Sequence, residues 1–136
     1  MTFDPPLAIA NMLDADSGLE LTLGTNLFAS MVRAASSTIP INAVFVYGAP
    51  GTPVLRVMGD GSEIRRPVVL VRVRWGSFVP GLAKMRAIQD FLVGNRPSGY
   101  LDIYTLQSEP DNLGSDSLGY HMWSLGVSVA YNNVAS

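Results

Sequence analysis

Apolar and polar side chains alternate most regularly over residues 69–75. Alternation with a period of two is typical of a strand that buries one face and exposes the other. We therefore expect a strand with one face in the core and a basic outer face. The inner positions are Val69, Val71, Val73 and Trp75, and the outer positions are Leu70, Arg72 and Arg74.

Other stretches also have strand character. Residues 41–48 and 99–106 are rich in β-branched, aliphatic and aromatic side chains, and residues 120–132 alternate over their whole length. The stretch 53–64 predicts two short strands around a Gly-Asp-Gly turn. Residues 107–119 are polar and rich in turn-forming side chains, so we expect a long turn region there.

Two segments predict helices. Asp4 precedes two prolines; aspartate can cap the free amides of a helix, and proline is tolerated in the first turn. We expect this helix to end at Gly18. Residues 80–94 carry apolar side chains every three or four positions and precede Pro97, which predicts the best-defined helix. Residues 19–40 combine strand-like and helix-like spacing, and their pattern leaves both open.

The order of these elements predicts an α+β fold, with a mainly antiparallel sheet and two helices packed on one face. We expect a single domain over residues 1–136, because a chain of this length can bury one substantial hydrophobic core. The expected core residues are Val71, Val73, Trp75, Leu82, Met85, Leu92, Ile103, Trp123, Leu125 and Val127.

The composition points to a subunit that hides surface against partners. Charged residues make up only 15% of the chain, against about 25% in a typical soluble domain. The mean hydropathy is +0.25. No apolar run approaches the ~18 residues that a membrane-spanning helix needs, so we expect no membrane association. We also expect no signal peptide, and the absence of cysteine excludes disulfides and thiolate metal sites.

Opposite charges are segregated along the chain. Arg65, Arg66, Arg72 and Arg74 fall within eleven residues that contain no acid, although the pI is about 5.1. The first twenty residues contain acids and no base. Separate positive and negative surfaces favour head-to-tail contact between identical copies. A solvated basic strand and a phosphate-binding face are the alternatives.

Little in the sequence suggests catalysis. The single histidine, His121, begins a predicted strand, and no serine lies in a nucleophile motif. Glu109, Asp111 and Asp116 could hold a divalent cation weakly, but they lack a calcium-loop pattern, and a solvated turn explains them more simply. We expect no catalytic residues, no metal site and no cofactor, and we expect that the protein is not an enzyme.

Two segments resemble the tail terminator (minor capsid) proteins of long-tailed bacteriophages. One is "RPVVLVRVRWGSFVPGLAKMRAIQDFL", an arginine-bearing strand followed by a turn and a helix. The other is "PDNLGSDSLGYHMWSLGVSV", a turn leading into the last strand. The sharpest part of the likeness is the turn motif, which consists of Pro110, Leu113, Gly114, Asp116, Gly119 and Tyr120.

The resemblance implies a structural virion protein that forms a hexameric ring. Such a ring caps the tail tube, stops its polymerisation and joins the tail to the head connector. Its partners are other copies of itself, the tail tube protein, the head connector protein and the genomic DNA that passes through the lumen. The ring assembles in the host cytoplasm and resides in the virion, at the head–tail interface.

Within such a ring, we expect Arg65, Arg66, Arg72 and Arg74 at a subunit interface or facing the lumen. The segment "RVMGDGSEIRR" departs from the family pattern and predicts an extra hairpin that contacts a neighbour. Another head–tail connector, head-completion or tube subunit is the main alternative function. A nucleic-acid-binding module that uses the arginine strand is the second alternative.

Overall fold

The computed structural model describes residues 3–29, 41–49, 55–56 and 63–133. These residues form two α-helices, one short 3-10 helix and eight strands. The elements are α1 (Pro5–Ala15), η1 (Ser17–Leu19), β1 (Leu27–Ala29), β2 (Ala43–Ala49), β3 (Leu55–Arg56), β4 (Glu63–Arg65), β5 (Val68–Trp75), α2 (Phe78–Gly94), β6 (Asp102–Thr105), β7 (Asp111–Ser115) and β8 (His121–Asn133).

The sheet is built around β8, its longest strand. β5 pairs with one edge of β8, and β6 and β7 pair with its other edge. Ser124 of β8 shows this, because it is the register partner of both Arg72 in β5 and Asp111 in β7. β2 lies outside β5, and β1 is the edge strand beyond it. Only the β1–β2 pairing is parallel among the described strands. The predicted α+β class with a mainly antiparallel sheet is therefore confirmed.

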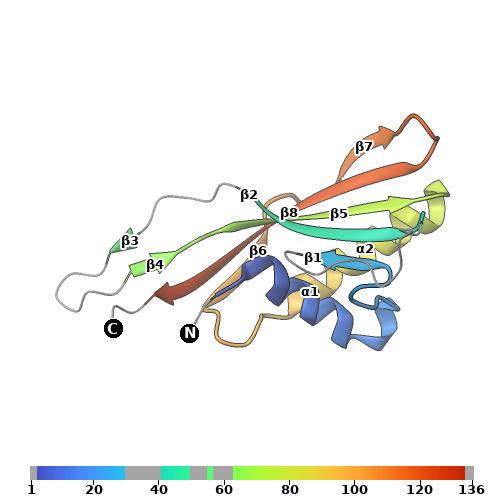
Figure 1. The fold of residues 1–136 in the computed structure, drawn as a ribbon. Helices are drawn as coiled ribbons and strands as arrows, with labels where there is room; N and C mark the ends of the chain where they lie inside the picture. Colours follow the sequence, from blue (N-terminus) through green and yellow to red (C-terminus); the bar gives the residue numbers. More distant parts are fainter. Residues whose placement is uncertain (1–2, 30–40, 50–54, 57–62, 134–136) are drawn as a thin grey trace.

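Both helices lie on the same side of the sheet, below it in Figure 1. Their apolar stripes pack on the inner face of β2, β5 and β8, and the predicted alternation of the arginine strand is confirmed. Within the described segments, neither helix is long and apolar enough to cross a membrane. The largest fully buried side chains are Trp123, Ile9, Leu13, Leu27, Met85, Ile88, Leu92, Leu125, Val44, Val46, Val69 and Val71.

The helix boundaries follow local chemistry. The Asp4 carboxylate accepts a hydrogen bond from the amide of Leu7 at 3.3 Å, as expected for a residue that caps α1. Gly81 in the first turn of α2 lies against Trp75 and Trp123. A side chain there would not fit, so this glycine allows the helix to approach the sheet closely.

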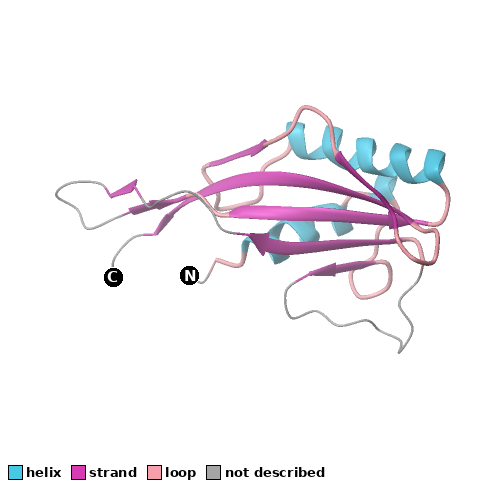
Figure 2. Cartoon of the chain, turned by 90° about the horizontal axis from the view of Figure 1, so that it is seen from above, coloured by secondary structure: helices cyan, strands magenta, loops and turns pink. Residues whose placement is uncertain are grey.

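One end of the sheet extends past the helices as an arm. It consists of β3, β4 and the last residues of β8, at the left of Figure 1. Leu55 pairs with Ile64, which supports the predicted extra hairpin; its Gly-Asp-Gly turn lies outside the described residues. Figure 2 looks onto the side of the sheet that neither α1 nor α2 covers, called the helix-free side below, where the long strands run side by side into the arm.

One sequence expectation needs correction, and part of the open region is now assigned. The stretch 107–119 was expected to be a turn region, but β7 lies within it and pairs with β8. Every side chain of β7 is exposed, so the strand has no apolar alternation to reveal it. In the ambiguous region 19–40, residues 27–29 form strand β1, and residues 30–40 lie outside the described part of the chain.

Candidate subunit interface

The helix-free side of the sheet carries the arginine pair of β5. Register places Arg72 opposite Phe45 and Arg74 opposite Ala43 on the neighbouring strand β2. The aromatic rings of Phe45 and Tyr47 on β2 therefore lie beside the two cations. We call this surface the arginine face. It consists of Phe45, Tyr47, Arg72, Arg74 and Tyr120.

Arg72 is held by an aromatic contact. Its guanidinium carbon lies 5.4 Å from the ring centroid of Tyr47, within the range of a cation–π interaction. The Arg72 Nε is buried and donates no hydrogen bond to the residues that the structure describes. Such an atom normally finds a partner, so this position has an unused hydrogen-bond donor.

Arg74 connects the arginine strand to the turn motif. Its guanidinium carbon lies 5.5 Å from the ring centroid of Phe45 and 6.0 Å from that of Tyr120. The Arg74 Nε donates a hydrogen bond to the carbonyl of Ile41 at 3.1 Å. These contacts fix the direction of the guanidinium. The sequence suggested no link between Arg74 and Tyr120, because 46 positions separate them.

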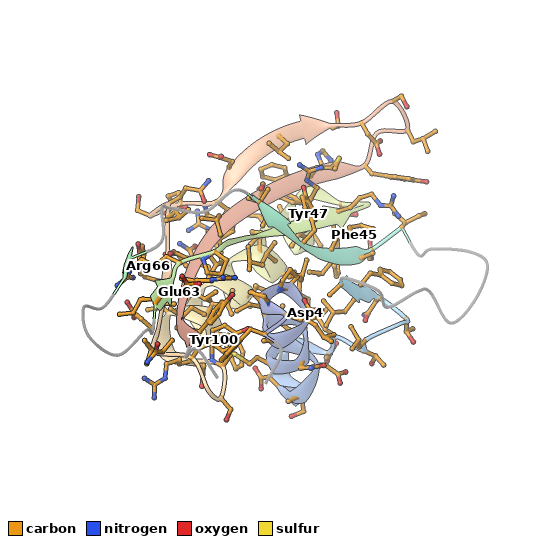
Figure 3. All side chains as sticks on the ribbon, turned by 60° about the vertical axis from the view of Figure 1, so that its left-hand side comes forward. Asp4, Phe45, Tyr47, Glu63, Arg66 and Tyr100 are labelled. Carbon is orange, nitrogen blue, oxygen red and sulfur yellow. The ribbon has the colours of Figure 1, made fainter. Side chains whose placement is uncertain are left out.

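Arg65 and Arg66 lie apart from the arginine face, at the end of β4 and directly after it. Arg65 forms a salt bridge with Glu63 at 2.5 Å, and Arg66 lies 3.9 Å from Asp102. Hydrogen bonding to Glu63 raises the pKa of Arg65 above its ordinary value. Figure 3 shows Glu63 and Arg66 well away from Phe45 and Tyr47. The four arginines of residues 65–75 are thus two separate pairs. Acids of the same chain form salt bridges with Arg65 and Arg66.

The turn motif forms a tight hairpin between β7 and β8. The Asp116 carboxylate accepts hydrogen bonds from the amides of Leu118 and Tyr120, at 2.9 and 3.0 Å. Gly114 and Gly119 have φ angles of +81° and +84°, which favour glycine.

The remaining motif residues, Pro110 and Leu113, lie on the β7 side of this hairpin. Pro110 directly precedes β7. Leu113 falls at an irregularity in the β7–β8 register and is 47% exposed. The motif therefore builds a hydrogen-bonded hairpin on which the Leu113 side chain remains at the surface.

The three acids considered as ligands for a divalent cation each have a different partner within the chain. Glu109 forms a salt bridge with Arg86 at 3.0 Å, and Asp111 accepts a hydrogen bond from Gln107. Asp116 is occupied by the turn amides. The described residues contain no group of three acids or histidines placed to hold a metal.

His121, the remaining candidate for chemistry, packs against aromatic rings. Its ring lies edge-on to Phe78, with centroids 5.5 Å apart, and 6.3 Å from Trp123. These contacts match the structural role that its place at the start of a strand suggested.

A second cluster of charges lies at the end of α1. Asp14, Asp16 and Glu20 fall within seven residues, and none of them forms a salt bridge with another described residue. We call these three residues the acidic end. The Lys84 ammonium donates a hydrogen bond to the carbonyl of Leu19, which ties this segment to α2. The acidic end therefore belongs to the helix layer.

An aromatic cluster joins the start of the chain to the end of β8. The rings of Phe3 and Tyr131 stack with centroids 4.1 Å apart, and Tyr100 lies edge-on to both. Burial, with smaller contributions from Tyr131 and Asp4, raises the pKa of Tyr100 to about 12. A hollow of about 200 Å³ borders this cluster, with Phe3, Asp4 and Tyr100 among its lining residues. Sequence reasoning missed the cluster, because its rings come from distant segments.

Comparison with known proteins finds similarity at the level of structure. No protein-family model matches the chain, and no curated protein sequence matches it. A solved structure described as "Virion of native gene transfer agent (GTA) particle" contains a chain with a similar fold. The TM-score is 0.62 at 16% sequence identity, and the match covers 95% of each chain. The protein therefore has the fold of a chain found in a virion.

Proposed function

We propose that this protein is a structural component of a phage-like virion. The observation that carries the proposal is the fold match, which spans nearly the whole of both chains. The proposal includes the expectation that the protein is not an enzyme and needs no cofactor.

Within the virion, we assign the protein the role of tail terminator. A hexameric ring of copies would cap the tail tube, stop its growth and receive the head connector protein, with DNA passing through the lumen. The exposed β7–β8 hairpin and the separate positive and negative surfaces support this role. Such surfaces suit heterologous contacts, which close into a ring when the rotation between copies permits.

A connector, head-completion or tube subunit is the second candidate, because the matched structure is described only as a virion. The two functions differ in where the protein resides. A terminator occupies one level between tube and head. A tube protein repeats along the tail, and a head-completion protein lies on the portal side.

Deletion of the gene from the particle's genome tests the terminator role. We expect filled heads without tails, together with free tail tubes of uncontrolled length, because nothing would stop tube growth. Supplying the protein in trans should restore tails of uniform length. Tails of normal length on intact particles after deletion would contradict the role.

A further inference from the structure

We propose that the arginine face of one copy binds the acidic end of a second copy. This inference rests on the proposed ring and identifies the two surfaces that meet in it. It also decides between two partners for Arg72 and Arg74, an acidic protein surface and the phosphates of DNA.

The first step is the balance of charges. The salt bridges among the described residues use Glu63, Asp102 and Glu109 as acids. The acidic end contributes three carboxylates outside these bridges, and the arginine face presents two guanidinium groups. Surfaces of opposite sign on one subunit align copies in a defined register.

The second step is geometry. The arginine face lies on the helix-free side of the sheet, whereas the acidic end lies in the helix layer on the other side (Figure 1). The sheet separates the two surfaces, so they cannot meet within one chain. Contact requires a second copy and is heterologous, which is the arrangement that a ring needs.

The third step is the chemistry of the arginine face. Each guanidinium is fixed over an aromatic ring, and Arg74 directs its Nε toward the protein. Tyr104 and Leu106, on the same side of the sheet, are 43% and 50% exposed. Fixed arginines among exposed aromatic and aliphatic side chains are typical of protein interfaces. Surfaces that bind DNA are far more positively charged than the arginine face, to which one copy contributes the two cations Arg72 and Arg74.

Cross-linking tests the contact directly, because the natural chain has no cysteine. Ser17→Cys places a thiol in the acidic end, and Met122→Cys places one opposite Arg74 on the neighbouring strand. Neither change alters a charge. A short thiol-specific linker should join neighbouring copies into a series of cross-linked products. The largest product should contain as many chains as the ring has subunits. The control variant carries Ser17→Cys with Ser98→Cys, which is exposed on a loop after α2, and should give little product.

Charge variants then test the cause of the contact. Adding Arg72→Gln to the cross-linking variant should reduce the cross-linked product about tenfold. Arg86→Gln, which removes the same charge from α2, should leave the product unchanged. If Arg72→Gln lowers the unfolding temperature, Glu20→Gln can replace it, because Glu20 is exposed. This variant removes a charge from the acidic end and should reduce the cross-linked product in the same way.

The outcomes separate this inference from the proposed function. Native mass spectrometry that shows a ring without the Ser17→Cys to Met122→Cys link would refute the inference and leave the ring intact. Absence of both the ring and the link, in solution and in particles, would refute both. Loss of duplex DNA binding by Arg72→Gln, with association unchanged, would assign the face to phosphate and overturn the inference.

Discussion

The guanidinium of Arg72 lies over the ring of Tyr47, 5.4 Å from its centroid, on the side of the sheet that no described helix covers. Two neighbouring strands supply these residues, so the sheet itself positions the cation. The same strand presents Arg74 two residues further on, against Phe45 and the turn residue Tyr120. A cationic surface built into a sheet in this way is available to a partner without rearrangement.

Replacement of Gly114 should destabilise the β7–β8 hairpin. Gly114 has a φ angle of +81°, which costs a residue with a Cβ roughly 1–2 kcal/mol. We expect Gly114→Val to lower the free energy of unfolding by about that amount, measured by denaturant titration. Because Gly114 has open space around it, crowding cannot explain the loss. An unchanged free energy would mean that the turn relaxes at no cost.

Replacement of Gly81 should be harmful for a different reason. A Cβ at Gly81 would lie 2.5 Å from Trp123 Cζ3 and 2.6 Å from Trp75 Cβ. We expect Gly81→Ala to lower the free energy of unfolding by about 1–3 kcal/mol, because α2 must move away from the sheet. Tryptophan fluorescence should report the shift.

Gly94→Ala is the matched control for Gly81→Ala, since it lies at the last position of the same helix with open space around it. It should leave the free energy of unfolding unchanged or raise it slightly. Equal losses from both variants would refute the close approach of α2 at Gly81.

The Asp116 carboxylate should stabilise the turn through its two amide partners. Asp116→Ala removes both acceptor bonds and should cost about 1–2 kcal/mol in thermal unfolding. Asp116→Asn keeps an acceptor oxygen, so it should retain most of the stability. If the two variants behave alike, the hydrogen bonds are not the cause.

Stability should fall at high pH because of Tyr100. Its pKa is raised to about 12 in the folded protein from about 10 in the unfolded chain, mainly by burial. The neutral phenol therefore stabilises the fold below pH 10, and this contribution is lost as the pH rises from 10 to 12. Denaturant titrations across this range should show a weaker decline in Tyr100→Phe than in the natural protein. An identical decline would contradict the shift.

The regular parts of the fold could be predicted from the sequence because they bury one face. The alternation in β5 and β8 and the apolar spacing in α2 record that burial directly. β7 was missed since every one of its side chains is exposed. Its pairing depends on its neighbour β8 and not on its own pattern.

The candidate interface could be predicted only in part. The sequence indicated that Arg72 and Arg74 point away from the core, and the register confirms that orientation. The sequence grouped them with Arg65 and Arg66, which instead form salt bridges with Glu63 and Asp102. Partners such as Tyr47, Tyr120 and Asp102 come from other elements, so spacing along one segment could not reveal them.

An image of the assembled particle at side-chain resolution tests the central claim most directly. The account predicts hexameric density for this chain at a single level, between the end of the tail tube and the head connector. It also predicts that Arg72 and Arg74 are covered by a neighbouring copy. Density that repeats along the tube, or a particle in which the chain occupies the shell, would contradict the account.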